Sequence, residues 1–245
     1  MNIAIILSGG VGARMGAGRP KQYLEVEGRT IFSFSMETLM RHPLVDAIVV
    51  VCAPEWQGVV DADVAALDAA ASGKEIIFAL PGETRQLSVF SGMEEAAERW
   101  GEEAGIVLVQ DAARPNTSPR IITDCIRGVA DGYDGAMPAV RVKDTIYLSD
   151  DGKEITSLLD RTTLYAGQAP EAFAFRKYLE AHRRLSPVEL KKITGSSELA
   201  HRAGLRVRLI KGEAENFKIT DKEDIERFRA KRANWRSDAS ELERP

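Results

Sequence analysis

Glycines and cations gather directly after the first apolar run of the chain. Residues 8–16 read Ser-Gly-Gly-Val-Gly-Ala-Arg-Met-Gly, and a Pro-Lys-Gln triplet follows at 20–22. Glycines let backbone N–H groups close around a phosphate, and side-chain cations add charge to such a loop. No Gly-Lys-Ser/Thr follows, so the segment is not a P-loop, and Met15 takes the third glycine position of a dinucleotide fingerprint counted from Gly10. We expect a phosphate-binding loop of another kind, with these candidate residues: Ser8, Gly9, Gly10, Gly12, Arg14 and Lys21.

A second polar segment follows the apolar run Glu75–Ala79 and begins an expected helix. Residues 81–89 of this segment read Pro-Gly-Glu-Thr-Arg-Gln-Leu-Ser-Val. Gly82 permits close approach of a ligand, Ser88 can bond the edge of a base, and a helix N-terminus favours an anion or a carbonyl oxygen. The plain alternative is an ordinary helix start with Thr84 as its N-cap.

The third polar segment is Asp-Ala-Ala-Arg-Pro at 111–115, after the apolar run Ile106–Gln110. An aspartate at the end of a strand can bond a ribose or help to hold Mg²⁺, and Arg114 can meet the phosphate of an acceptor. An ion pair of Asp111 and Arg114 on the surface is the alternative.

Apolar runs of strand length alternate with stretches of helical periodicity around these segments. The expected strands are Ile3–Leu7, Ala47–Cys52, Glu75–Ala79, Ile106–Gln110 and Gly135–Pro138, and the expected helices are Thr30–Met40, Trp56–Ala70, Arg85–Trp100 and Pro119–Ala130. This alternation predicts an α/β fold of Rossmann-like type, with a mostly parallel, twisted sheet and helices on both faces. Ligands bind at the carboxyl ends of such strands, which predicts that the loops after Leu7, Ala79 and Gln110 surround one crevice.

The pattern changes after Pro138, where Val142–Leu148 and Lys153–Leu158 alternate around Ser-Asp-Asp-Gly and predict a hairpin. We expect one domain over residues 1–232 with a β-arm at about 139–162 that projects from the sheet. An exposed arm usually needs a partner, which favours a homodimer. The rest of the chain is expected to form three helices, one strand and a tail. The helices are Phe175–Arg184, Ser196–Ala203 and Lys222–Arg232, the strand is Arg206–Ile210, and the tail at 233–245 is polar and mobile.

Gly-Gly-x-Gly-x-Arg-Met followed by Pro-Lys-Gln resembles the signature loop of nucleotidyltransferases that activate sugar and polyol phosphates. The 81–89 and 111–115 segments match, in order, the family of 2-C-methyl-D-erythritol 4-phosphate and ribitol-5-phosphate cytidylyltransferases, from about Met1 to about Arg232. The resemblance implies transfer of CMP from CTP to a polyol phosphate with Mg²⁺ and release of pyrophosphate.

The resemblance also implies a role for each matching residue. Arg14, Lys21 and Lys218 are the implied catalytic cations, and Asp111 is implied to hold the ribose or the metal. The implied nucleotide-binding residues are Ser8, Gly9, Gly10, Gly12, Gly82, Arg85, Ser88 and Asp111. The implied acceptor-binding residues are Arg114, Thr145 and Arg161, the last two across the dimer interface.

Two places depart from the family pattern near the expected acceptor site. Ala169 stands where a threonine usually precedes the proline, with Glu171 after it, and Thr194-Gly195 stands where Thr-Asp is usual. Lys-Asp-Thr at 143–145 resembles the methylerythritol branch, whereas Gly-Gly at 9–10 and Tyr-x-Gly-Gln at 165–168 resemble the ribitol branch. The acceptor therefore stays open between methylerythritol 4-phosphate and ribitol 5-phosphate.

Bulk composition excludes several classes of protein. The 245 residues carry a net charge of −4, with 33 Lys and Arg against 37 Asp and Glu, which gives no basic excess for a nucleic-acid partner. No apolar stretch reaches the length of a membrane span, and Cys52 and Cys125 lack metal-type spacing, so we expect a cytoplasmic protein. The competing classes are a UTP- or GTP-dependent nucleotidyltransferase, a nucleotide-binding protein without activity, and a nicotinamide oxidoreductase. The last is disfavoured, because this sequence has Cys52 after Val50-Val51, where such an enzyme has an acidic residue.

Overall fold

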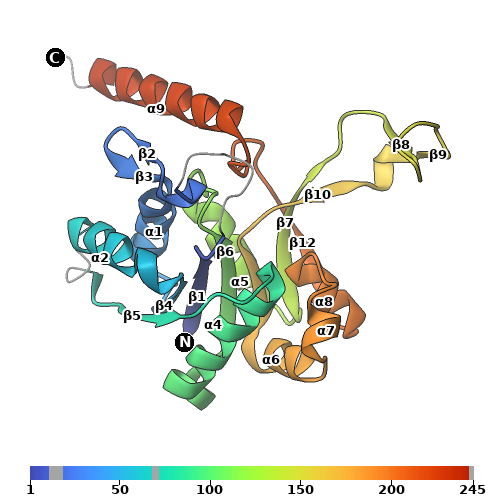
Figure 1. Cartoon of the computed structure of the whole chain (residues 1–245), viewed down its shortest axis with the longest axis horizontal. Coiled ribbons are helices and arrows are strands. Elements are labelled where there is room, and N and C mark those ends of the chain that lie inside the picture. Colours follow the sequence, from blue (N-terminus) through green and yellow to red (C-terminus); the bar gives the residue numbers. More distant parts are fainter. Residues whose placement is uncertain (11–18, 68–71, 243–245) are drawn as a thin grey trace.

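The structure is a computed structural model that describes residues 1–10, 19–67 and 72–242, with side chains as far as Ala233. A central sheet of eight strands runs through it in the order β10-β7-β11-β6-β1-β4-β5, with β12 paired to β7 (Figure 1). The strands of this sheet are β1 Asn2–Leu7, β4 Ala47–Val51, β5 Glu75–Ala79, β6 Ile106–Asp111, β7 Gly135–Arg141, β10 Tyr165–Gly167, β11 Glu171–Ala174 and β12 Val207–Lys211.

The direction of the strands follows the predicted plan. The pairs β1–β4, β1–β6, β4–β5 and β12–β7 are parallel, whereas β11 runs antiparallel between β6 and β7 and β10 runs antiparallel to β7. Leu7 pairs with Val51 on one side and with Asp111 on the other, and Val51 pairs with Ala79. The carboxyl ends of β1, β4, β5 and β6 therefore end side by side, which places the three expected loops at one edge of the sheet.

Alternate residues of the buried strands feed two cores, because successive side chains of a strand point to opposite faces. Ile3 and Ile5 belong to the core under α4 Arg85–Trp100, α6 Phe175–Arg183 and α8 Ser196–Arg202. Ala4 and Ile6 belong to the core under α1 Ile31–Arg41, α2 Gln57–Ala66 and α5 Pro119–Ala130. The predicted covering of both faces is confirmed.

A third, smaller core joins the end of the chain to its beginning. Phe228 and Ile225 of α9 Lys222–Leu242 pack with Phe34 and Ile31 of α1, and the Phe34 and Phe228 rings meet edge to face at 5.2 Å. The helix expected to close at Arg232 continues to Leu242, so most of the expected tail is helical. The remaining short elements are β2 Glu25–Val26, β3 Arg29–Thr30 and α7 Pro187–Leu190.

The predicted arm projects from the body beyond β7 and β10 (Figure 1). Its two strands, β8 Ile146–Leu148 and β9 Ser157–Leu159, pair antiparallel. The second strand was expected to begin at Lys153, directly after a turn at 149–152, but it begins at Ser157. That predicted start was wrong because the turn takes up more residues than expected. Oδ1 of Asp151 accepts the N–H groups of Lys153 (2.8 Å) and Glu154 (3.0 Å), which turns the chain there and delays the strand to Ser157.

Candidate active site

A cavity of about 700 Å³ opens at the carboxyl ends of the parallel strands. Its walls come from the loops after β1, β5 and β6 and from the segment before α9, which the sheet register brings together. The predicted crevice therefore exists. Its lining includes these expected site residues: Gly9, Gly10, Lys21, Gly82, Arg85, Ser88, Asp111 and Lys218. Gly12 and Arg14 lie outside the described residues.

The glycine loop is held by the triplet that follows it. The Nε2 of Gln22 donates to the backbone carbonyl oxygens of Ser8 (2.6 Å) and Gly10 (2.8 Å), and Gln22 is 4% exposed. The hydroxyl of Ser8 donates to that of Tyr23 (2.8 Å), which donates to the Ser8 carbonyl oxygen (3.1 Å). Ser8 is thus buried against Tyr23, and its side chain braces the loop.

The glycine loop touches the loop after β5 directly. A Cβ atom on Gly9 would lie 2.3 Å from Cβ of Pro81, and one on Gly82 would lie 2.4 Å from Cβ of Leu87. Both glycines are therefore required by close approach of the chain. Oγ of Ser88 accepts the N–H of Gly82 (3.0 Å) and bonds the carbonyl oxygen of Thr84 (3.0 Å), so Ser88 shapes the turn that it also lines.

Sequence reasoning left two interpretations for residues 81–89, and the structure supports part of each. Thr84 is the N-cap of α4, since its side chain accepts the N–H of Leu87 (3.4 Å). The same helix start also forms a wall of the cavity, to which Gly82, Arg85 and Ser88 contribute. An N-cap and a ligand-binding helix terminus are therefore compatible here.

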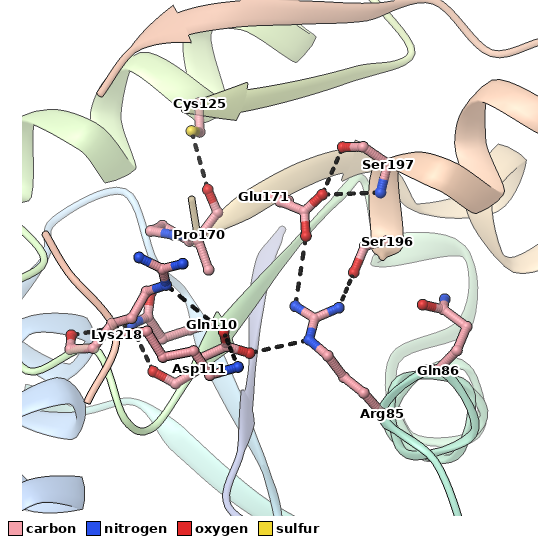
Figure 2. Close-up of polar contacts among 12 residues, drawn as sticks. Arg85, Gln86, Gln110, Asp111, Cys125, Pro170, Glu171, Ser196, Ser197 and Lys218 are labelled. Carbon is pink, nitrogen blue, oxygen red and sulfur yellow. Dashed lines mark hydrogen bonds and ion pairs between the residues drawn. The ribbon is translucent and has the colours of Figure 1, made fainter. Parts of the chain in front are cut away.

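Asp111 lines the cavity and is the buried centre of a cluster of charged side chains (Figure 2). Its Oδ1 lies 3.1 Å from Nε of Arg85, and its Oδ2 lies 3.0 Å from Nζ of Lys218 and 3.7 Å from Nε of Arg114. Burial alone would raise the pKa of the Asp111 carboxyl, but the positive charges of its three partners outweigh burial and hold that pKa well below its usual range. Asp111 is therefore ionised at neutral pH.

Arg85 joins this cluster to a second carboxylate. Its guanidinium contacts Oε1 of Glu171 at 3.5 Å and donates to the hydroxyl of Ser196 at 2.6 Å, while Nε holds Asp111 (Figure 2). All three partners are buried. Arg85, which was expected to bind the nucleotide, thus links β6, β11 and α8 through its side-chain contacts and also forms part of the cavity wall.

A second cavity of about 310 Å³ adjoins the first and shares Arg85, Asp111 and Lys218 with it. Arg114 lines this smaller cavity, and its expected role in binding the acceptor stays a prediction. Its other lining residues come from β7, β10, β11 and the start of α8: Met137, Gly167, Gln168, Ala169, Glu171, Thr194, Gly195, Ser197 and Glu198. Both departures from the family pattern, at 169–171 and at 195, lie in this wall.

Thr145 and Arg161 are not brought to either cavity within one chain. Both are exposed on the arm, where Nη1 of Arg161 donates to the carbonyl oxygen of Lys143 (2.9 Å). The arm extends away from the central sheet in this chain (Figure 1). Their expected role across a dimer interface stays a prediction.

Sequence reasoning missed two positioning residues of the site, Gln22 and Glu171. Gln22 was noted only as part of a matching triplet, and nothing in its type predicts that it ties two carbonyl groups of another loop. Glu171 was noted as a departure from a pattern, and its signal was a carboxylate beside the apolar run Ala172–Phe173, which becomes β11. A buried acidic residue there needs a cationic partner.

The metal expected near Asp111 has few protein ligands to draw on. Within the described ranges, no group of three or more His, Cys, Asp or Glu side chains lies close enough to hold an ion. Mg²⁺ is commonly bound by one or two carboxylates together with substrate phosphates. Asp111 fits that arrangement as a single ligand, and a site made by the protein alone does not.

Comparison with known proteins agrees with this architecture. The profile of the family described as IspD, 2-C-methyl-D-erythritol 4-phosphate cytidylyltransferase, matches residues 2–231. The chain belongs to this family. It is 39% identical over 230 residues to the bifunctional enzyme IspD/IspF of Nitrobacter winogradskyi, covering 94% of this chain and 55% of that protein. It is 32% identical over 231 residues to ribitol-5-phosphate cytidylyltransferase of Streptococcus agalactiae serotype III, covering 94% and 95%.

The cytidylyltransferase fold is also seen in solved structures. 4-Diphosphocytidyl-2C-methyl-D-erythritol synthase from Anaerococcus prevotii superposes with a TM-score of 0.78 at 26% identity, covering 94% of this chain and 95% of that one. The chain thus spans about half the length of its bifunctional relative but nearly the whole length of the other two. Among the described helices, none has the length and apolar character needed to cross a membrane.

Proposed function

We propose that this chain transfers the CMP moiety of CTP to the phosphate of a small polyol phosphate and releases pyrophosphate. The observation that carries the proposal is the pair of adjoining cavities that share Arg85, Asp111 and Lys218. Two substrates that react with each other must meet, and a shared charged floor is where a nucleotide in one cavity contacts an acceptor in the other. The family to which the chain belongs supports the same reaction.

CTP fits the larger cavity, because its walls supply what a nucleoside triphosphate needs. The glycine loop held by Gln22 offers backbone N–H groups to phosphates, Lys21 adds a cation from the same loop, and the Gly82 turn admits a flat base at close range. Arg14, which lies outside the described residues, is the third cation that the family pattern implies here. Asp111 is placed to bond the ribose or a metal-bound phosphate.

The acceptor phosphate attacks the α-phosphorus in line with the departing pyrophosphate. One bond forms between an acceptor phosphate oxygen and the α-phosphorus, and the bond from that phosphorus to the β-phosphate oxygen breaks. Two anions must approach each other, so catalysis depends on positioning and on positive charge. Lys21 and Lys218 stabilise the crowded phosphoryl group, and Arg114 orients the acceptor phosphate from the smaller cavity.

We further propose Mg²⁺ as the divalent ion of this reaction, held by triphosphate oxygens with Asp111 as a protein ligand. Such an ion neutralises the charge that develops on the leaving pyrophosphate. The three cations around Asp111 keep its carboxylate ionised, and therefore able to act as a ligand at neutral pH.

The acceptor stays between 2-C-methyl-D-erythritol 4-phosphate and D-ribitol 5-phosphate. The family profile and the bifunctional relative support the first, and the Streptococcus relative, matched over 95% of its length, supports the second. The replaced side chains at 169, 171 and 195 all line the smaller cavity. Sites built on hydrogen bonds discriminate strongly among alcohols, so these three positions bear on the choice.

We also propose that the arm forms a homodimer and carries Thr145 and Arg161 to the acceptor site of the partner subunit. Support comes from the apolar side chains that the arm exposes, which include Tyr147, Ile155 and Leu158 at 56%, 67% and 63%. Exposed apolar patches of this kind commonly mark an interface. A cytoplasmic location, where CTP is available, is part of the same proposal.

Release of pyrophosphate from CTP, UTP, GTP and ATP, measured against a panel of polyol and sugar phosphates, tests the proposal. We expect turnover with CTP and with one of the two alditol phosphates, and background rates with the other nucleotides. Turnover with UTP or GTP and a sugar 1-phosphate, but not with CTP, would overturn the cytidylyl assignment. Binding of CTP without turnover on any acceptor would indicate a nucleotide-binding protein instead.

A further inference from the structure

Glu171 is a buried carboxylate in the wall of the smaller cavity. It begins β11 and is 6% exposed. Its Oε2 accepts the backbone N–H (2.9 Å) and the hydroxyl (2.5 Å) of Ser197 at the start of α8, and its Oε1 faces the Arg85 guanidinium at 3.5 Å (Figure 2). These contacts fix the carboxylate in one orientation and leave it acceptor capacity, since an ionised carboxylate offers about four lone-pair sites.

Charge is distributed unevenly across this cavity. Lys218 and Arg114 both approach Oδ2 of Asp111, so two cations meet one carboxylate oxygen at that end. At the other end Arg85 is shared between Oδ1 of Asp111 and Oε1 of Glu171, so one cation serves two carboxylates. The cavity is therefore positive toward Lys218 and Arg114, whereas toward Glu171 the charge of Arg85 is balanced by Glu171 and the wall holds a further carboxylate, Glu198.

An acceptor that carries a phosphate has one orientation that suits this charge pattern. Its phosphate lies toward Lys218 and Arg114, where the reaction takes place, and the other end of its carbon chain lies toward Glu171. Hydroxyl groups donate hydrogen bonds to a carboxylate, whereas a second anion placed beside it would be repelled.

We propose that Glu171 is a specificity-determining residue, which makes the enzyme select alditol phosphates and reject aldonate phosphates of the same chain length. The inference rests on the proposed function and names the chemistry of the acceptor end that is remote from the phosphate. An alditol ends in CH₂OH and an aldonate ends in COO⁻, so the two differ only in the group that meets Glu171.

The test compares two matched pairs of acceptors, ribitol 5-phosphate with ribonate 5-phosphate and erythritol 4-phosphate with erythronate 4-phosphate. Initial rates of CTP-dependent pyrophosphate release give kcat/KM for each acceptor and KM for CTP. The variants are Glu171→Gln, which removes the charge at nearly constant shape, and Glu171→Asp, which keeps it. Glu180→Gln is the matched control, because Glu180 is an exposed carboxylate of α6 away from both cavities.

For Glu171→Gln we expect kcat/KM with the preferred alditol phosphate to fall by about 10-fold to 100-fold, the effect of losing a charged hydrogen-bond acceptor. The ratio of alditol to aldonate kcat/KM falls by about 10-fold or more because the repulsion also disappears. KM for CTP stays within about 3-fold, because Arg85 keeps its contacts with Asp111 and Ser196 when Glu171 loses its charge. Glu171→Asp keeps the negative charge, and Glu180→Gln changes a residue away from both cavities. We therefore expect both variants to keep the wild-type ratio of alditol to aldonate kcat/KM within about 3-fold.

Equal losses on alditol and aldonate in Glu171→Gln, with the ratio unchanged, overturn the inference, because they mean that Glu171 only supports Arg85 and α8. A wild-type enzyme that uses both members of a pair equally overturns it as well. These results leave the proposed function standing. If the wild-type protein releases no pyrophosphate from CTP with any of the four acceptors or with methylerythritol 4-phosphate, the proposed function fails, and the inference fails with it.

Discussion

The ammonium nitrogen of Lys218 lies 3.0 Å from Oδ2 of Asp111, which ties the segment before α9 to the carboxyl end of β6. The backbone supports the same junction, because the N–H of Ile219 donates to the carbonyl oxygen of Ala113 at 2.8 Å. Asp111 thereby holds the proposed catalytic cation Lys218 at the floor of the larger cavity before any substrate arrives. Groups fixed in advance cost no reorganisation when charge develops in the transition state.

Removal of either lysine that we propose as catalytic tests the role of positive charge. We expect Lys21→Ala and Lys218→Ala each to lower kcat by about 100-fold or more, the scale of losing one preorganised charge. Steady-state rates of pyrophosphate release measure this loss. Lys192→Ala, at an exposed position after α7, is the control and should keep wild-type turnover. Near wild-type kcat in Lys21→Ala or Lys218→Ala would remove that lysine from the mechanism.

The ion pairs of Asp111 predict a pH-dependent contribution to stability. The pKa of Asp111 is lower in the folded chain than in the unfolded one, so the contribution is complete above the unfolded value of about 4 and is lost as the pH falls below it toward the folded value. Asp111→Asn removes the carboxylate that pairs with three partly buried cations and should lower the free energy of unfolding at pH 7 by about 2 kcal/mol.

Urea unfolding of wild type and Asp111→Asn between pH 7 and pH 3 measures this effect. The difference between the two proteins should be largest at pH 7 and smaller at pH 3. Asp61→Asn, an exposed position of α2, serves as the control and should track the wild type. A difference that grows as the pH falls would contradict the assigned direction of the pKa shift.

Substitution of Gly82 tests the close contact behind the Gly82 turn. In Gly82→Ala the new Cβ would lie 2.4 Å from Cβ and 2.7 Å from the carbonyl carbon of Leu87, so the turn must move. We expect kcat/KM for CTP to fall by about 10-fold to 100-fold, because displacement of a binding loop by about 1 Å has effects of that size. Gly58→Ala is the matched control, since no atom lies within 4 Å of its new Cβ and alanine favours helix α2.

A charge on the arm tests the proposed dimer. Leu158 of β9 is 63% exposed in one chain, and Leu158→Asp would place an anion in an apolar contact if the arm is buried in a partner. Light scattering should then show a monomer, and kcat/KM for the acceptor should fall by about 10-fold or more, with KM for CTP nearly unchanged. Val188→Asp, at an exposed position of α7, is the control for added charge. A wild-type protein that is monomeric at all concentrations would contradict the proposal.

Much of the fold was predictable from the sequence, because the local composition of a segment indicates whether it is buried and how long a strand it can form. Ala47–Val51 and Glu75–Ala79 are short and mostly apolar, and they form strands within one residue of the prediction. The helix Arg85–Trp100 was predicted at its observed bounds because Thr84 caps it and its apolar residues recur at helical spacing. β11 was missed because four residues do not show whether they lie between two other strands.

Less of the site was predictable, because its geometry depends on pairings that no local pattern encodes. The position of Asp111 at the end of a strand indicated a ribose or metal site, whereas Lys218 was expected only from the family resemblance; both line the larger cavity. The sharing of Arg85 between Asp111 and Glu171 was not predictable, since it needs the antiparallel insertion of β11 next to β6. The role of Ser8 was not predictable for the same reason. Its hydroxyl donates to that of Tyr23, and no local pattern indicates this pairing.

The most direct test of the central claim follows an oxygen atom from acceptor to product. The acceptor, methylerythritol 4-phosphate or ribitol 5-phosphate, is labelled with ¹⁸O in its phosphate and incubated with unlabelled CTP and Mg²⁺. Attack by the acceptor phosphate should give a CDP-alditol whose mass carries the whole label, with ¹⁸O in the bridge between its two phosphorus atoms, and unlabelled pyrophosphate. Label in pyrophosphate, or formation of CMP without a CDP-alditol, would contradict attack of the acceptor phosphate on the α-phosphorus.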